Sequence, residues 1–350
     1  MSWTYRPAAR TWRHDACVAA PVAFHAGLPG YAPTPLVELP SLADELGVGR
    51  VLVKDESARL GLPAFKVLGV SWAVQRMLET EIPAALVTAS DGNHGRALAQ
   101  VARQRGVPAR VYLPDGVHPA ARAAIQSEGG TVVDVPGSYD TAVAAAAADA
   151  DAGGGALIQD TAWAGYEQIP GWIVEGYLTL FAEIDDQLTT ESDLVIVPAG
   201  VGSLAQAAVT YYRRAGLTAA PALLTVEPDS AACVLDSLAD GEPRTVATAT
   251  TIMVGLNCGT VSHVAWPLLR AGLDAACSVS DQAAGSAAAD LARLGVAAGP
   301  CGGAALAAAR EVLADSRRAD RLGITGHSTV VLLCTEGQAA NPYREENIRE

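Results

Sequence analysis

The sequence predicts an α/β protein with two lobes, in which parallel sheets are flanked by helices. Between about residues 85 and 335 one rhythm recurs: a short run rich in β-branched residues, a turn rich in Gly or Asp, then an Ala-rich helical run. Such alternation produces a parallel sheet with helices on both faces. A chain of 350 residues with 50% hydrophobic residues is large enough for two lobes.

Each element follows from its local pattern. A first strand is expected at Val51–Val53, and a helix follows from Val67 to Leu78. Alanine has the highest helix propensity, so its densest stretches, 142–152 and 283–298, are also predicted to be helical. The other strands are expected at 85–88, 110–113, 131–135, 156–159, 194–198, 223–227 and 329–333, and the other helices at 95–105, 119–127, 139–152, 172–187, 204–214 and 303–314.

Composition and charge exclude several classes of function. The net charge of −14 argues against nucleic acid or an anionic membrane as a partner. The first residues lack the apolar core of a signal peptide, and no stretch approaches about 18 uninterrupted apolar residues, so we expect a cytoplasmic protein. The six cysteines form no C-x-x-C pair and the six histidines show no ligand spacing, so neither a metal site nor a disulfide framework is predicted.

Only two of the 24 basic residues are lysines, at 54 and 66. An amine can lose its proton when desolvated and attack a carbonyl, which a guanidinium cannot do. Lys54 ends a strand beside Asp55 and Glu56, which favours an ion pair with one of them. Lys66 lies among apolar residues at a helix start, where the ammonium form is disfavoured. The alternative for Lys66 is a lysine whose amine reaches solvent from a helix end.

Two glycine-containing loops follow predicted strands. Residues 88–95, TASDGNHG, lead into a helix and could hold a carboxylate; alternatively, Asp91 and Asn93 are helix caps. Residues 198–204, PAGVGSL, offer backbone N–H groups and a hydroxyl to a phosphate, or form an ordinary turn. The dinucleotide motif would need glycine at Ala205, and a P-loop would need Gly-Lys, so a monophosphate anchor remains. With a reactive lysine, this favours pyridoxal phosphate as the cofactor.

With these motifs the sequence resembles the fold-type II pyridoxal-phosphate enzymes, and within them the diaminopropionate ammonia-lyases. The similarity runs from about Thr34 to the C-terminal loop, and the stretch QDTAWAGYEQIPGWIVEGY at 159–177 is the most specific part. The other matching motifs are Lys54–Ser57, Ala64–Lys66, Asp91–Arg96, Ala199–Gly202, Val226–Asp229, Thr251–Met253 and Thr335–Gly337. The resemblance implies a homodimer, with a large cofactor-binding domain at 1–84 plus 190–350 and a small domain inserted at 85–189.

The resemblance also implies roles for single residues. Lys66 would hold the cofactor through a Schiff base and shuttle the α-proton. Asp91 and Asp160 would lie in the substrate pocket, with Asp91 as the base for the D-isomer. Cys334 would face the pyridine nitrogen as a neutral partner. The remaining cofactor-binding residues would be Asn93, beside the phenolic oxygen, and Gly200, Val201, Gly202 and Ser203, at the phosphate.

The implied reaction is α,β-elimination from a β-substituted amino acid, in the first place 2,3-diaminopropionate, to give pyruvate and ammonia. Three departures from the lyase pattern remove acids, within 298–304, at Thr260 and within 338–340. A β-replacement synthase, a dehydratase for serine or threonine, and a non-catalytic binding protein therefore remain alternatives. Cys233 and Cys258 match lyase positions, and the resemblance suggests that they pair as a disulfide.

Overall fold

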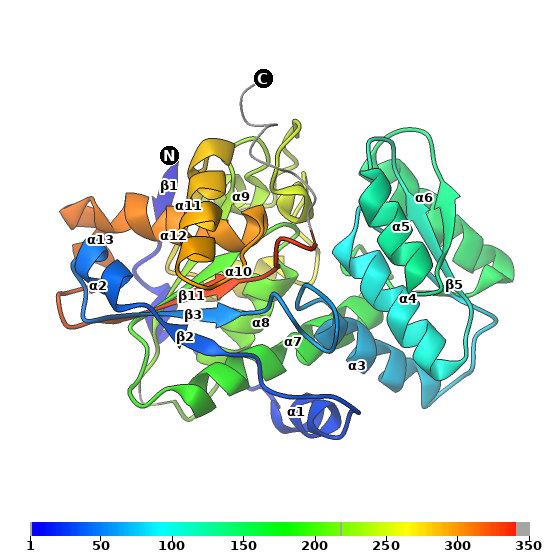
Figure 1. Ribbon diagram of the computed structural model, residues 1–350, viewed down its shortest axis with the longest axis horizontal. Helices are drawn as coiled ribbons and strands as arrows, with labels where there is room; N and C mark the ends of the chain where they lie inside the picture. The colour runs from blue at the N-terminus through cyan, green and yellow to red at the C-terminus, as the bar shows by residue number, and fades with distance from the viewer. Residues whose placement is uncertain (1, 218, 341–350) are drawn as a thin grey trace.

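The computed structural model contains two separate sheets (Figure 1) and describes residues 2–217 and 219–340. The predicted large domain also includes residues 1, 218 and 341–350, which lie outside the described residues. The first sheet has seven strands in the order β1-β10-β9-β8-β11-β3-β2, and the second has four in the order β6-β5-β4-β7. The strands are β1 Trp3–Tyr5, β2 Leu36–Glu38, β3 Arg50–Asp55, β4 Leu86–Ala89, β5 Ala109–Leu113, β6 Thr131–Asp134, β7 Ala156–Leu157, β8 Leu194–Pro198, β9 Ala222–Pro228, β10 Ala275–Val279 and β11 Thr329–Cys334.

Helices cover both sheets, as the alternating pattern predicts. They are α1 Ala19–Ala26, α2 Pro40–Leu46, α3 Val67–Leu78, α4 Asn93–Arg105, α5 Pro119–Ser127, α6 Tyr139–Asp149, α7 Gln168–Gln187, α8 Ser203–Tyr212, α9 Cys233–Asp240, α10 Trp266–Gly272, α11 Asp281–Arg293, α12 Pro300–Leu313 and α13 Ser316–Leu322. None of the described helices is long and apolar enough to span a membrane. The α/β class with parallel sheets between helices is thus confirmed.

The order of the large sheet creates a switch point between β8 and β11. Strands β8, β9 and β10 are parallel neighbours on one side, while β11 lies between β8 and β3 and is parallel to both. Only the two edge strands, β1 and β2, are antiparallel to their neighbours. Loops that leave the carboxyl ends of strands at such a point diverge, and the crevice between them is where α/β proteins bind ligands.

The central strands are buried on both faces. In β11, Val331 and Leu333 pack against one core cluster, whereas Val330 and Leu332 pack against a second cluster on the opposite face. The two-residue period of a strand sends neighbouring side chains to opposite faces. Because this strand is covered by helices on both sides, its sequence is continuously apolar, VVLLC at 330–334.

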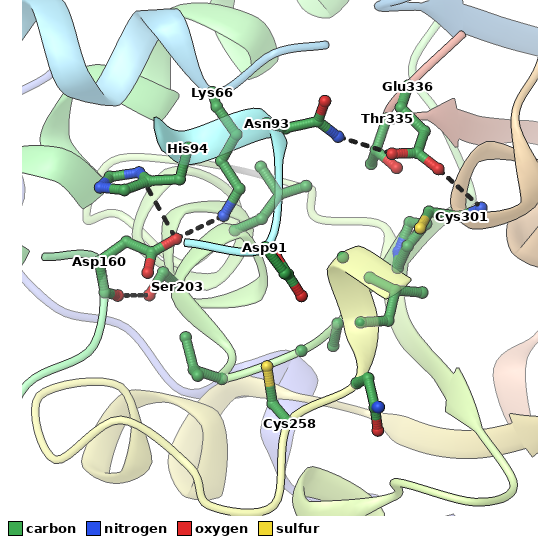
Figure 2. Close-up of a pocket in the computed structure, with 18 of the residues that line it drawn as sticks. Lys66, Asp91, Asn93, His94, Asp160, Ser203, Cys258, Cys301, Thr335 and Glu336 are labelled. Carbon is green, nitrogen blue, oxygen red and sulfur yellow. Dashed lines mark hydrogen bonds and ion pairs between the residues drawn. The ribbon is translucent and has the colours of Figure 1, made fainter. Parts of the chain in front are cut away.

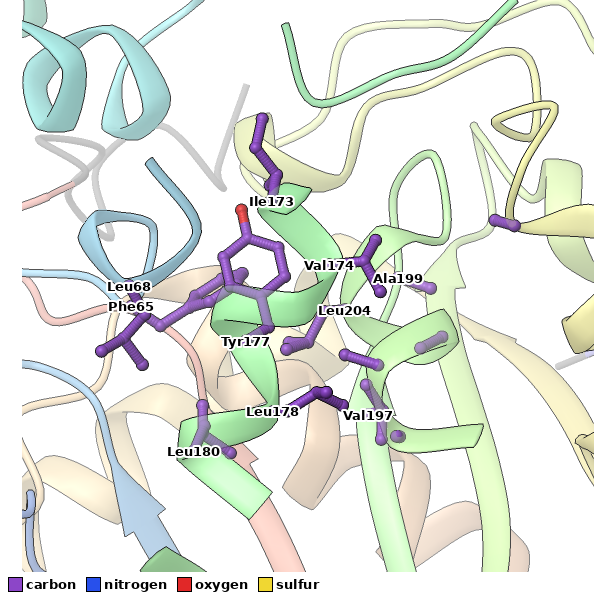
Figure 3. Packing of buried hydrophobic residues seen from close by; sticks show 14 of the residues in the cluster. Phe65, Leu68, Ile173, Val174, Tyr177, Leu178, Leu180, Val197, Ala199 and Leu204 are labelled. Carbon is purple, nitrogen blue, oxygen red and sulfur yellow. The ribbon is translucent and has the colours of Figure 1, made fainter. Parts of the chain in front are cut away.

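Helices α3 and α7 pack closely, because each has a glycine at their contact; Figure 3 shows Leu68 beside Ile173 and Tyr177 at this contact. A Cβ atom on Gly69 would lie 2.5 Å from Cε1 of Tyr177, and one on Gly176 would lie 2.5 Å from the carbonyl oxygen of Leu68. Lys66 is the N-cap residue of α3. The fixed contact between the two helices therefore fixes the backbone that carries Lys66.

The four-stranded sheet lies within residues 86–157, and α4, α5 and α6 accompany it on the right of Figure 1. The predicted small domain ran from 85 to 189 and thus included α7. Helix α7 packs against α3 and α8, beside the seven-stranded sheet. The division at 85 and 189 stays a prediction.

The prediction missed strands β1, β2 and β10 and helices α1, α2, α9, α10 and α13, and it misplaced the ends of two alanine-rich helices. Strand β10 was not predicted, because its sequence AACSV is rich in alanine, which is poor in strands. The alanine-rich stretch at 283–298 is helical only to Arg293, and Gly295 then takes a positive φ of 92°. Helix α6 ends at Asp149, and a π-helical turn continues to Gly154. Composition indicated the two alanine-rich helices but not their ends.

A buried ion cluster joins β3, the loop after it and α7. Glu183 accepts hydrogen bonds from Arg59 through both of its oxygens, at 2.6 and 2.7 Å, and pairs with Lys54 at 2.7 Å. Arg59 also pairs with Glu56. The direct ion-pair partner of Lys54 is thus Glu183 rather than Asp55 or Glu56, although the nearby Glu56 carboxylate also favours the charged amine. The carboxylate that pairs with it lies on a helix more than a hundred residues away, which local sequence could not indicate.

We predict that Glu183→Gln lowers the free energy of unfolding by about 3–5 kcal/mol, because it leaves buried positive charge without its counter-charge. The measurement is the midpoint of urea denaturation. Asp186→Asn, an exposed carboxylate on the same helix, is the matched control and should change stability by less than about 0.5 kcal/mol. Equal midpoints for the two variants would show that the cluster does not stabilise the fold.

Candidate active site

One pocket lies where β8 and β11 end, between the two sheets (Figure 2). Its wall comes from eight places in the chain: the starts of α3, α6 and α12, the loop into α4, the segment 255–258, and the loops after β7, β8 and β11. The polar and sulfur-containing residues that line it are Lys66, Ser90, Asp91, Asn93, His94, Tyr139, Asp160, Ser203, Asn257, Cys258, Cys301, Thr335 and Glu336. The pocket therefore collects residues that are far apart in the sequence.

Lys66 forms an ion pair with Asp160, with 2.5 Å between Nζ and Oδ2. Burial disfavours the charged amine, but the Asp160 carboxylate outweighs it and holds the pKa of Lys66 above its ordinary value. In the same way, burial would raise the pKa of Asp160, but the Lys66 ammonium lowers it to about 2. The expectation of an uncharged lysine in an apolar setting was therefore wrong for this state, because the decisive acid is remote in sequence.

Among the described residues, Asp91 has no such cationic partner at hydrogen-bond distance, and burial raises its pKa to about 6. The alternative that Asp91 and Asn93 are helix caps is wrong. The N-cap residue of α4 is Gly92, and the backbone N–H groups of Gly92 and Gly95 donate to the Ser90 hydroxyl. The Asp91 carboxyl is thus left available to the pocket.

The loop after β8 has the form of an anion cradle. Gly202 has a φ of 95°, which favours glycine, and α8 begins at the next residue. The first helical hydrogen bond runs from the Gln206 N–H to the Gly202 carbonyl, so the preceding N–H groups have no partner within the helix. A Cβ at Gly200 would lie 3.0 Å from the Cys258 sulfur. The Ser203 hydroxyl donates a hydrogen bond to the backbone carbonyl of Asp160. This bond connects the loop after β8 to the residue that pairs with Lys66.

The opposite wall is built around Glu336. Its Oε2 accepts a hydrogen bond from Asn93 Nδ2 at 2.6 Å, and its Oε1 accepts one from the Cys301 N–H at 3.3 Å. This carboxylate thus joins the start of α4 to the end of β11 and the start of α12. Asn93, predicted to bind the cofactor, already has a charged partner in the pocket.

Cys334 lies apart from the other predicted site residues. It is fully buried, its thiol donates to the Glu336 carbonyl at 3.3 Å, and a Cβ on Gly302 would come within 2.8 Å of its sulfur. The residues that line the pocket on this side are Cys301 and Thr335. Burial raises the pKa of Cys334 well above its ordinary value, so the group is a neutral thiol.

The structure brings the other predicted residues together and adds some. Lys66, Asp91, Asn93, Asp160 and the loop from Gly200 to Ser203 all line the pocket. His94, Glu336, Cys301, Tyr139 and Asn257 were not predicted. His94 and Glu336 lie within the motifs DGNHGR and TEG, which could have indicated them, but nothing local marked the other three. Cys233 and Cys258 are free thiols here, so the suggested disulfide between them is not present.

These residues fit a cofactor with an aldehyde and one phosphate. Lys66 brings an amine to the pocket, and the loop from Gly200 to Ser203 brings N–H groups and a hydroxyl. Two buried oxygens that line the pocket, Asn257 Oδ1 and Thr335 Oγ1, have no hydrogen-bond partner among the described residues. Buried polar atoms without a partner are rare, so these two indicate a polar ligand.

Comparison with known proteins gives the same result. A family model described as pyridoxal-phosphate dependent enzyme matches residues 28–336. The diaminopropionate ammonia-lyase of Salmonella typhimurium is 41% identical over 280 residues, covering 71% of this chain and 69% of that protein. A biosynthetic L-threonine dehydratase of Mycobacterium leprae is 31% identical over 252 residues, which are 70% of this chain and 56% of that protein.

Among solved structures, the Escherichia coli diaminopropionate ammonia-lyase in complex with an aminoacrylate-PLP azomethine reaction intermediate has a TM-score of 0.85. The two are 30% identical, and the match covers 97% of this chain and 94% of that one. The predicted fold type and cofactor are confirmed. This chain belongs to the family of pyridoxal-phosphate dependent enzymes, in the fold-type II class.

Proposed function

We propose that this chain is a pyridoxal-phosphate-dependent carbon–nitrogen lyase that converts 2,3-diaminopropionate to pyruvate and ammonia by α,β-elimination. The observation that carries the proposal is the Lys66–Asp160 ion pair beside a monophosphate cradle, with the second acid, Asp91, on the same pocket. Support also comes from the relative that is 41% identical and is named diaminopropionate ammonia-lyase.

When it is bound, pyridoxal phosphate supplies an electron sink that makes the α-proton of an amino acid acidic. Lys66 would hold it, and the backbone N–H groups of the loop from Gly200 to Ser203 would bind its phosphate. Asn93 would contact it from the other lobe. The Cys334 thiol, being neutral, would leave the pyridine nitrogen without a carboxylate partner, although Cys301 and Thr335 are the residues that line the pocket there.

Lys66, Asp160 and Asp91 would have separate roles in the proton transfers. Lys66 is the base for the α-proton of the L-isomer, and it needs a free lone pair on Nζ for this step. Asp160 orients Nζ through its Oδ2 oxygen. Asp91 is the base for the D-isomer, since a carboxyl with a pKa of about 6 is largely ionised at neutral pH yet remains a proton acceptor.

A second function is favoured by one observation. Of the three departures from the lyase pattern, the segment 298–304 reaches the pocket through Cys301, whereas Thr260 hydrogen-bonds to Thr245 and does not line the pocket. The loss of an acid beside Cys301 would weaken recognition of a cationic β-amino group. A β-replacement synthase or a serine or threonine dehydratase is therefore the second candidate.

We also propose a cytoplasmic homodimer, with a large domain at 1–84 plus 190–350 and a small domain at 85–189. The resemblance supports the dimer, and six free cysteines suit a reducing compartment. An amino acid is the proposed partner, with no nucleic acid or membrane. Light scattering on purified protein should give about twice the chain mass of 35.9 kDa; a mass equal to one chain would contradict the dimer.

We predict that Lys66→Ala and Lys66→Arg both abolish the visible absorption of bound cofactor and lower pyruvate formation from 2,3-diaminopropionate by about 10²-fold or more. Lys66→Arg is the matched variant, because it keeps a positive charge beside Asp160 but cannot react with an aldehyde. Absorbance and pyruvate are followed in the same cuvette.

The wild-type result separates the candidates. A band that shifts with substrate while pyruvate accumulates supports the lyase. A band that shifts without pyruvate, or pyruvate that an added nucleophile suppresses, supports β-replacement instead. No visible band after incubation with pyridoxal phosphate would contradict the role of Lys66.

We predict that Asp91→Asn lowers turnover of D-2,3-diaminopropionate by about 10²–10⁴-fold and changes that of the L-isomer little. In the wild type, kcat/KM for the D-isomer should fall about tenfold per pH unit below about pH 6, because protonated Asp91 cannot accept a proton. The L-isomer is the internal control for folding and cofactor content. Equal losses for both isomers would contradict an enantiomer-specific base.

A further inference from the structure

One oxygen of Asp160 faces two nitrogen bases (Figure 2). Its Oδ2 lies 2.5 Å from Lys66 Nζ and 3.8 Å from His94 Nδ1. Both side chains lie on the same pocket, but they come from different elements, Lys66 from the start of α3 and His94 from the first turn of α4. The proposed function uses Lys66 and Asp160 and assigns nothing to His94.

The tautomer of neutral His94 follows from its other nitrogen. Nε2 lies 2.7 Å from the Ile158 carbonyl oxygen, and a carbonyl can only accept, so Nε2 carries the hydrogen. Neutral His94 then directs the bare lone pair of Nδ1 toward a carboxylate. Nδ1 is buried and has no hydrogen-bond partner among the described residues. A proton on Nδ1 would turn this unfavourable contact into an ion pair with Asp160.

The charge on Lys66 decides whether that proton can be held. The groups whose charges act on His94 are Asp160, which follows β7, and Lys66, which precedes α3. Burial lowers the pKa of His94, the Lys66 ammonium lowers it further, and the Asp160 carboxylate raises it. While Lys66 is charged, His94 is therefore neutral. When Lys66 is neutral, its opposing charge disappears, so the Asp160 carboxylate acts against burial alone and the pKa of His94 rises.

We propose that His94 is a positioning residue that holds a proton on Nδ1 whenever Lys66 is neutral, so that Asp160 always has one cationic neighbour. The proposal rests on the proposed role of Lys66 as a base. In the step itself an Nζ–H bond breaks and an Nδ1–H bond forms, with the proton crossing the Oδ2 oxygen that both nitrogens face. The positive charge moves from the ammonium to the imidazolium, and no other reactant is needed.

The transfer matters because a buried carboxylate without a cation tends to bind a proton itself. A protonated Asp160 could no longer accept a hydrogen bond at Oδ2 from both neighbours, and Nζ would lose its orientation. With the proton on His94, the carboxylate remains ionised and Lys66 keeps its acceptor. His94 therefore acts through Asp160 rather than on the substrate.

The test compares the full chain without added cofactor as Lys66→Met and Lys66→Arg, both labelled with ¹⁵N-histidine. The ring nitrogen shifts of His94 are followed by NMR from pH 5 to 9 and assigned by their absence from His94→Gln. Lys66→Met removes the charge and keeps an unbranched side chain that is one atom shorter, whereas Lys66→Arg keeps the charge. The pKa of His94 should be higher in Lys66→Met by about one pH unit or more.

One further variant tests whether the Asp160 carboxylate causes the increase. Adding Asp160→Asn to Lys66→Met should remove the increase, because the carboxylate is its cause. Arg and Met variants with the same titration of His94 would overturn the proposal, as would an increase that survives Asp160→Asn. Neither comparison requires catalysis. A chain that fails to form pyruvate would contradict the proposed function, but the NMR result would still decide the role of His94.

A kinetic readout completes the test in the loaded enzyme. His94→Gln should keep KM for L-2,3-diaminopropionate and the visible absorption of the cofactor but lose kcat, since binding is intact and proton transfer is not. A raised KM with unchanged kcat would show a merely structural role and would overturn the proposal.

Discussion

The insertion of β11 between β8 and β3 is the constraint on which the site depends. Three parallel strands then end side by side at the point where the loops of the large sheet diverge. The loop after β8 brings the cradle at Gly200–Ser203, and the loop after β11 brings Glu336. Because Glu336 also binds Asn93 at the start of α4, the same edge anchors the second lobe.

Three carboxyl groups line the pocket, and burial by itself would favour the uncharged form of each. Asp160 stays ionised because the Lys66 ammonium lies beside it, whereas Asp91 lacks such a partner and its pKa rises to about 6. Glu336 is occupied by the Asn93 amide and the Cys301 N–H. Three similar groups thus differ in environment: one pairs with an amine, one lies in the pocket with a raised pKa, and one joins two lobes.

Close packing gives these charges their fixed positions. The glycines at 69 and 176 let α3 and α7 approach until backbone meets backbone, and Lys66 is the N-cap residue of α3. The buried cluster of Arg59, Glu183 and Lys54 holds the other end of α7 to β3. Catalytic groups carried by such rigid elements need little rearrangement when charge moves among them.

The sequence by itself determined what depends on neighbouring residues: the strand and helix rhythm, the helix beginning after Lys66, and the glycine turn before α8. The tertiary structure decided what depends on distant ones. The partners Asp160 for Lys66 and Glu183 for Lys54 lie 94 and 129 residues away in the chain, and Cys334 lies behind the pocket wall. Local pattern sets backbone conformation, but the charge state of a buried group is set by whichever side chain the fold brings to it.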